Sequence, residues 1–189
     1  MDAGFLFTGD GGGSGGFAAC GAGSLTADRN HALIALLYRS GLRNSEAVVL
    51  EPKDLDLESG SIRVLHGKGG RARTVGIDPG WAEIVSEWTA TRARLRLGRR
   101  GAVFVARRNV PLSTVYCRRL LTQLARRAGI ERRVHPHGLR NTHAAELRAE
   151  DVDIGIISEQ FGHRSIATTA RYLDHIVPHD VVAAIRATA

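Results

Sequence analysis

The sequence predicts a mainly α-helical domain of the α+β class with one small antiparallel β-sheet. Its length of 189 residues and hydrophobic content of 43% suit one domain with a proper core. Apolar residues recur at helical spacing over most of the chain. They alternate with a period of two only beside one glycine-rich turn, at residues 66–70, which is typical of a β-hairpin.

Two helices are predicted to open the ordered part of the chain. The order begins near Ser24, and Asp28 is expected to cap the first helix. Its apolar residues follow helical spacing: Leu33, Ile34, Leu36 and Leu37. Gly41 ends this helix, and a second, short one is expected over about residues 44–50.

The predicted hairpin lies between residues 62 and 77. Ile62 and Val64 alternate with other residues before the turn, and Val75 and Ile77 do so after it. The turn itself carries Lys68. An amphipathic helix over about residues 81–96 and a short apolar strand at 103–105 are expected to follow.

The second half of the chain is predicted to be helical. Ser113 caps a helix that ends at Gly129, and further helices span about 138–148, 154–161 and 166–173. Gly162 stops the second of these and Ser165 caps the third. In the Ser113 helix, one apolar face is formed by Leu121, Leu124, Ala125 and Ala128. The arginines lie off that face: Arg118, Arg119, Arg126 and Arg127.

The first 24 residues differ in composition from the rest. They include nine glycines, so residues 1–24 are expected to be a disordered tail or linker and residues 25–189 the folded domain. The G-x-G-x-x-G pattern at residues 11–16 has no strand and helix around it, so it does not indicate a nucleotide site.

The charge distribution predicts a polyanionic partner. The net charge is +7, and residues 91–133 hold thirteen arginines against one acid, Glu131. Such a basic field attracts DNA or RNA. The alternative is an arginine-rich composition from a GC-rich genome with merely solvated side chains, but that does not explain the near absence of acids there.

Other classes of protein are disfavoured. Cys20 and Cys117 form no CxxC pair, which favours a reducing cytoplasm over a disulfide framework. No apolar run is long enough to span a membrane. The spacing of His135, His137, His143 and His163 matches no zinc motif, so no metal is expected.

Five short patterns occur in a fixed order. They are GLRNSE at 41–46, HGKGGR at 66–71, HGLR at 137–140, FGH at 161–163 and SIATTARYL at 165–173. In this order they resemble the motifs of tyrosine recombinases of the phage-integrase type, over about residues 25–175. The resemblance implies the helical catalytic domain of that family. It also implies a metal-free enzyme, without cofactors, that breaks and rejoins DNA through a 3′-phosphotyrosine.

Phosphodiester cleavage needs cations aimed at the nonbridging oxygens, where negative charge grows in the transition state. Guanidinium groups bind such oxygens bidentately. Arg43 and Arg140 are therefore the predicted clamp, and Glu46 is expected to orient Arg43. The alternative for Arg43 is an ordinary surface ion pair with Glu46, one helical turn later.

The resemblance assigns the remaining catalytic roles. Tyr172 is the predicted nucleophile, whereas Tyr38 and Tyr116 are expected to be packing residues. Lys68 would protonate the leaving 5′-oxygen, His137 would serve in acid–base catalysis at the tyrosine hydroxyl, and His163 would hydrogen-bond the phosphate. The alternatives are a solvated turn lysine and packed core histidines.

Double-stranded DNA is the predicted partner. Its expected contacts are Arg71, Arg73, Arg118, Arg119, Arg126 and Arg127. The resemblance implies a tetramer on synapsed DNA, a monomer or weak dimer when free, a cytoplasmic, nucleoid-associated location, and a link to phages or mobile elements.

Two departures from the family pattern leave alternatives open. Gly138 stands where an acid is usual. A glycine-rich stretch also takes the place of the N-terminal core-binding domain of full-length members. The alternative functions are a DNA-binding remnant without productive recombination and a type IB topoisomerase-like activity.

Overall fold

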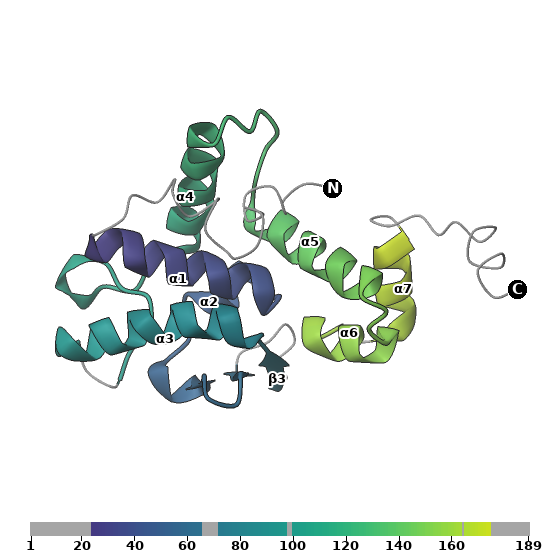
Figure 1. Ribbon diagram of the computed structural model, residues 1–189, viewed down its shortest axis with the longest axis horizontal. Helices are drawn as coiled ribbons and strands as arrows, with labels where there is room; N and C mark the ends of the chain where they lie inside the picture. Colours follow the sequence, from purple (N-terminus) through teal and green to yellow (C-terminus); the bar gives the residue numbers. More distant parts are fainter. Residues whose placement is uncertain (1–23, 66–71, 98–99, 164, 175–189) are drawn as a thin grey trace, which may run out of the picture.

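The computed structural model describes residues 24–65, 72–97, 100–163 and 165–174. This part of the chain contains seven α-helices and a three-stranded antiparallel sheet (Figure 1), which confirms the predicted fold class. The predicted hairpin turn, with Lys68 and Arg71, lies outside the described residues, as does the predicted tail up to residue 23. None of the described helices is long and apolar enough to cross a membrane.

The helices and strands follow the predicted order closely. In chain order they are α1 Leu25–Arg39, α2 Asn44–Ala47, the 3-10 turn η3 Pro52–Asp54, β1 Leu55–Asp56, β2 Ser61–Val64, β3 Arg73–Gly76, α3 Pro79–Arg94, the 3-10 turn η4 Arg107–Asn109, α4 Thr114–Arg127, α5 Pro136–Ala149, α6 Ile154–Phe161 and α7 Ile166–Asp174.

Most helix caps are those predicted from the sequence. The hydroxyls of Ser113 and Ser165 accept hydrogen bonds from backbone N–H groups in the first turns of α4 and α7. The cap predicted for α1 was wrong. Ser24 caps this helix, because its Oγ accepts from the N–H of Ala27 at 3.2 Å, and Asp28 lies inside the first turn.

The sheet has one strand more than predicted, and one predicted strand is absent. β1 pairs with β2, but its two residues are too few to show an alternating pattern. Residues 103–105 form no strand. Only Val105 makes an isolated bridge, to Pro111. The segment is apolar because Val103 and Phe104 are fully buried.

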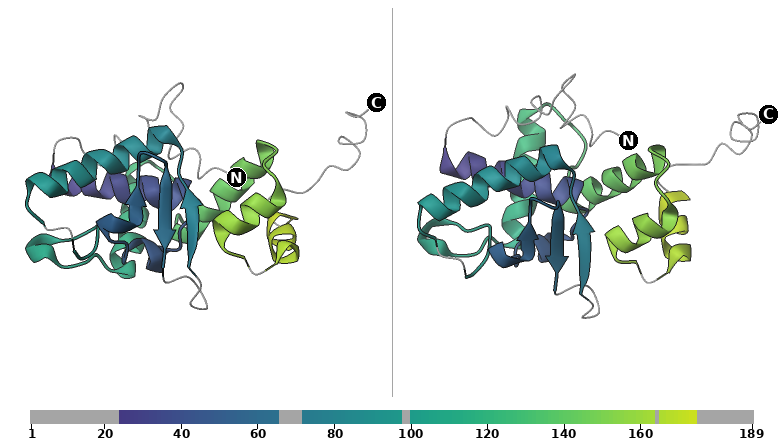
Figure 2. Two further views of the ribbon diagram at one scale, coloured as in Figure 1. Left: turned by 90° about the horizontal axis from the view of Figure 1, so that it is seen from below. Right: turned by 60° about the horizontal axis from the view of Figure 1, so that its bottom comes forward.

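The core has two parts. In the larger part α1 packs against α3 and α5, with the sheet and α4 around them. The smaller part consists of Ala144, Ile157, Phe161 and Leu173 and joins α5, α6 and α7. Figure 2 shows these last helices together at one end of the molecule, with β3 beside α6.

The side chain of Gln160 fastens α6 to its neighbours. Its Nε2 donates to the carbonyl oxygens of Ser40, at 3.0 Å, and Gly76, at 2.8 Å. Its Oε1 accepts from the N–H of Gly76 at 2.9 Å. The end of α1, the strand β3 and the end of α6 are therefore held together by one amide.

We expect Gly162→Ala to destabilise the fold. Gly162 ends α6 with φ of 58°, and a Cβ there would lie 2.9 Å from Cδ of Arg73. Gly129→Ala is the matched control, because Gly129 has φ of 70° and open space around it. Both variants should lose about 1 kcal/mol of unfolding free energy from backbone strain.

The clash with Arg73 should make the loss in Gly162→Ala clearly larger than in Gly129→Ala. Urea denaturation of the two variants and the wild type measures the difference. Equal losses would show that Arg73 does not pack tightly against the end of α6.

Candidate active site at the end of α6

Two arginines from separate parts of the chain meet at the C-terminal end of α6. Arg140, on α5, donates to the carbonyl oxygens of Gly41 and Phe161. Arg43, the residue before α2, donates from Nη2 to the carbonyls of Phe161 and Gly162, each at 3.5 Å. The two guanidinium groups therefore share one acceptor, the carbonyl oxygen of Phe161.

The chain supplies this acceptor because α6 ends there. The last carbonyls of a helix lack intrahelical partners and carry a partial negative charge, so they attract cations. Gly162 turns the backbone into the left-handed region directly after Phe161. The ring of Phe161 is fully buried and lies under Arg140, with 4.5 Å between the guanidinium carbon and the ring centroid.

Glu46 is the acid that holds Arg43. It accepts from the backbone N–H of Arg43 at 2.8 Å and from its Nη1 at 2.9 Å, which is the predicted contact. It also accepts hydrogen bonds from both terminal nitrogens of Arg73, at 2.9 and 2.8 Å. The side chain of Glu46 is only 2% exposed, so this is a buried ion pair and not an ordinary surface pair.

The environment of Glu46 keeps it ionised. Burial alone would raise the pKa of its carboxyl. The hydrogen bonds from Arg73 and from the backbone of Arg43, with the charge of Arg73, instead lower the pKa to about 2.

The side chain of His163 links the end of α6 to α7. Its Nδ1 lies 2.9 Å from Oγ1 of Thr169, which is fully buried. Burial, followed by the positive charges of Arg140 and Arg43, lowers the pKa of His163 to about 4. This histidine is therefore neutral at pH 7.

His137 is close enough to Arg140 and Arg43 for their positive charges to act on it, as they do on His163. It lies in the first turn of α5, and partial desolvation, the charge of Arg140 and then those of His135 and Arg43 lower its pKa. The structure thus brings together four of the six predicted catalytic residues: Arg43, Arg140, His137 and His163.

The nucleophile candidate, Tyr172, lies on α7, and its side chain is not among those that the structure describes. Leu173 and Thr169, one turn apart on α7, are buried. The helix is therefore fixed to α6 by an apolar contact and by the hydrogen bond to His163.

An open groove of about 500 Å³ continues from His137 toward α4. It is lined by Asn44, Ser45, Thr114, Arg118, Arg133, His135, Pro136 and His137. The other arginines predicted on α4 are exposed as well: Arg119, Arg126 and Arg127. Arg73 was also predicted to contact DNA, but its side chain is only 13% exposed and faces Glu46.

Several supporting residues were not predicted from the sequence. Phe161 belongs to the FGH pattern, but the pattern did not predict that its carbonyl oxygen and its ring contact arginines. Gln160 acts through hydrogen bonds of its side-chain amide. His135 caps α5, since its Nδ1 accepts from the N–H of Gly138 at 3.0 Å. This cap holds the start of the helix at the position where the family's usual acid is missing. Arg133 could have been found from its place in the basic segment.

Metal coordination finds no support among the described residues, where no three His, Cys, Asp or Glu side chains gather closely enough to hold an ion.

The family model for "Phage integrase family" matches residues 18–177 of the chain. The chain belongs to this family. The match begins inside the glycine-rich stretch and includes all five motifs of the phage integrase pattern.

Named relatives agree with the family match. The chain is 34% identical over 161 residues to tyrosine recombinase XerC of Thermodesulfovibrio yellowstonii, covering 80% of this chain and 53% of that protein. It is 35% identical over 148 residues to the type 1 fimbriae regulatory protein FimE of Escherichia coli K12, covering 78% and 75%. The chain thus spans about half of XerC and three quarters of FimE.

Solved structures share the fold. XerA recombinase superposes with a TM-score of 0.75 at 28% identity, over 91% of this chain and 59% of that one. XerH site-specific recombinase, bound to palindromic difH substrate in a post-cleavage complex, gives 0.73 at 26% identity, over 89% and 49%.

We expect the free energy of unfolding to fall at low pH because Glu46 becomes protonated there. Its folded pKa, about 2, lies below the ordinary value of 4.5, so its contribution is fully present above about pH 4.5 and is lost as the pH falls toward 2. Glu46→Gln should cost about 3 kcal/mol at pH 7, because two arginines lose their buried partner.

Chemical denaturation across this pH range, compared with Glu159→Gln on the exposed side of α6, measures the effect. The slope of stability against pH between about 4.5 and 2 should be smaller in Glu46→Gln than in the control. Parallel slopes in the two variants would show that Glu46 is not the acid that titrates.

Proposed function

We propose that this chain breaks and rejoins DNA at specific sites through a covalent bond between Tyr172 and a 3′-phosphate. The observation that carries the proposal is the convergence of Arg43 and Arg140 on one carbonyl oxygen. Two guanidinium groups at one point offer the charge that a phosphodiester transition state requires. Membership of the phage integrase family and the names of the relatives support the same activity.

The proposed reaction balances without a metal or an energy source. The hydroxyl oxygen of Tyr172 attacks phosphorus and loses its proton, while the bond from phosphorus to the 5′-oxygen breaks. Lys68 gives the leaving oxygen a proton. The products are a 3′-phosphotyrosine and a free 5′-hydroxyl, and attack by a 5′-hydroxyl in the reverse direction reseals the strand.

The two histidines would differ in their roles. A pKa lowered from its ordinary value leaves His137 largely neutral at pH 7, so it can accept the proton of the tyrosine hydroxyl. His163 stays neutral well below that pH and would hydrogen-bond the phosphate without adding charge. Thr169 would fix its ring orientation through Nδ1.

The DNA would lie along the groove that joins His137 to α4. Arg118 and Arg133 line this groove, and exposed arginines continue along α4. Phosphate contacts of this kind position a duplex and are independent of sequence. Arg71 remains a proposed contact beside them, and we assign Arg73 to the support of Glu46. On synapsed DNA we propose a tetramer, and a monomer or weak dimer when free.

We expect Tyr172→Phe to abolish the covalent adduct and to leave DNA affinity almost unchanged. The hydroxyl is the nucleophile, but phosphate contacts dominate the binding free energy. A nicked suicide duplex that traps the adduct, resolved on a denaturing gel, measures the first effect, and a mobility shift measures the second. Tyr116→Phe is the matched control and should form adduct. A persistent adduct in Tyr172→Phe would exclude this tyrosine as the nucleophile.

We expect removal of single charges from the groove to reduce the salt dependence of binding. Arg118→Gln should lower the slope of log affinity against log salt by about 0.9, the value for one phosphate contact. Arg148→Gln, in the last turn of α5, is the comparison outside the groove and should leave the slope unchanged. The proposed DNA path would be wrong if both variants changed the slope equally.

A further inference from the structure

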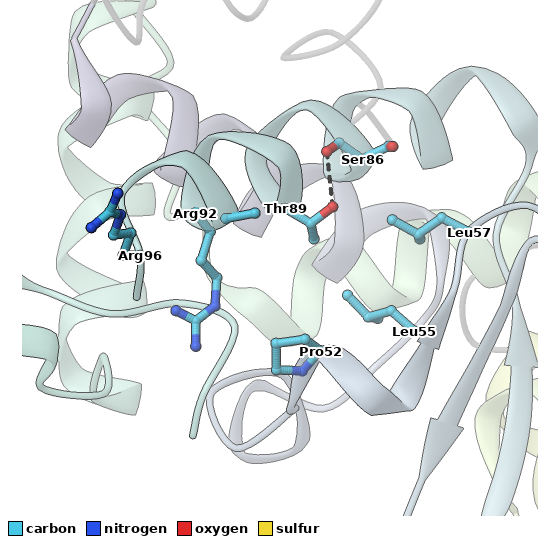
Figure 3. Close-up of a pocket in the computed structure, with 8 residues that line it drawn as sticks. Pro52, Leu55, Leu57, Ser86, Thr89, Arg92 and Arg96 are labelled. Atoms are coloured by element: carbon cyan, nitrogen blue, oxygen red, sulfur yellow. Dashed lines mark hydrogen bonds between the residues drawn. The ribbon is translucent and has the colours of Figure 1, made fainter. Parts of the chain in front are cut away.

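A second hollow lies far from the site formed by Arg43 and Arg140. It has a volume of about 700 Å³ and opens between α3 and the segment that contains η3 and β1 (Figure 3). Its lining residues are Pro52, Leu55, Leu57, Ser86, Thr89, Arg92, Ala93 and Arg96. The residues that α3 contributes to the lining, from Ser86 onward, lie in its C-terminal half. Figure 1 shows this end of α3 far from α6 and α7.

The unusual member of this lining is Arg92. It is only 2% exposed, and Nη1 donates to the carbonyl of Leu97 at 3.2 Å. Its Nε and Nη2 are both buried and have no hydrogen-bond partner within the part of the chain that the structure describes. These two nitrogens form the edge of a guanidinium that binds a carboxylate through two parallel hydrogen bonds.

No acid among the described residues forms an ion pair with Arg92. None of the residues that line the hollow is an acid, and the second cation there, Arg96, is exposed. Burial lowers the pKa of Arg92, as expected for a charge without a partner. A buried donor edge left unpaired destabilises a fold, so its presence in a hollow points to an acceptor that comes from outside.

The walls limit what that acceptor can be. Pro52, Leu55 and Leu57 make one side of the hollow apolar. A duplex backbone would have to bury its sugars against this wall to bring a phosphate to Arg92. A carboxylate carried between apolar groups satisfies both the wall and the guanidinium edge.

We propose that this hollow binds an acidic side chain flanked by apolar residues on a partner polypeptide. The carboxylate pairs with Nε and Nη2 of Arg92, and its apolar neighbours cover Leu55 and Leu57. The hollow would thus be a docking point for a second protein, separate from the site that acts on DNA, and its test does not depend on the proposed recombination.

A protein-detected NMR titration of the full chain tests the proposal. The probe is acetyl-Leu-Glu-Leu-amide, and the uncharged control peptide is acetyl-Leu-Gln-Leu-amide. In the millimolar range the glutamate peptide should shift the Nε resonance of Arg92 and the amides that line the hollow. The glutamine peptide should bind at least about tenfold more weakly. Absence of shifts, or equal binding of the two peptides, would overturn the proposal.

Two variants separate binding from folding. Arg92→Met should weaken binding at least about tenfold without lowering the melting temperature, because it removes a buried unpaired charge and keeps an apolar stem of similar shape. Arg94→Met is the matched control, since Arg94 is exposed on the same helix and does not line the hollow. It should bind the peptide like the wild type.

Other outcomes would refute the role of Arg92. A large fall in melting temperature for Arg92→Met would show that the guanidinium serves the fold itself. Displacement of the peptide by inorganic phosphate or by duplex DNA at equal concentration would show that the hollow is a phosphate site.

Discussion

The carbonyl oxygen of Phe161 is the point on which the candidate active site depends. It becomes available because α6 stops at Gly162, and it accepts hydrogen bonds from Arg43 and Arg140, which come from separate parts of the chain. A helix end holds cations without neutralising them by a full negative charge. The arrangement therefore keeps two guanidinium groups together at one oxygen, while the full negative charge that balances Arg43 comes from Glu46.

The same clustering explains the neighbouring ionisable groups. Arg43 and Arg73 share a single buried acid, Glu46, and Arg140 lies beside Arg43 at the carbonyl oxygen of Phe161, so positive charge is in excess. Burial and the positive charges of Arg140 and Arg43 keep His163 neutral. The hydrogen bonds and charge of Arg73, with the backbone hydrogen bond from Arg43, lower the pKa of Glu46 against the effect of burial. Assembly of such a site is unfavourable in the free protein, and a bound phosphodiester would offset the repulsion. Without a bound phosphodiester, the hydrogen bonds of Gln160 hold α6 against the end of α1, and the hydrogen bond of Thr169 holds α7 against the end of α6.

The sequence predicted the parts of this structure that depend on local chemistry. Serine caps, the stop at Gly162 and the contact between Glu46 and Arg43 follow from residues close in the chain, and they were identified correctly apart from the cap of α1. Contacts between residues distant in the chain could not be predicted from the sequence. The strand predicted at 103–105 was buried loop, β1 was too short to show a period, and Arg73 faces Glu46 across the fold. The role of Phe161 lies in its main-chain oxygen, which every residue has.

The central claim is that Arg43 and Arg140 act as one unit on one phosphate. A double-mutant cycle of Arg43→Lys and Arg140→Lys tests it, with single-turnover formation of the covalent DNA adduct as the readout. Lysine keeps the charge but loses the bidentate geometry. We predict a coupling energy of at least about 1 kcal/mol, so that the double variant loses at least about fivefold less rate than the product of the two single losses. Effects that add within about 0.5 kcal/mol would contradict the claim.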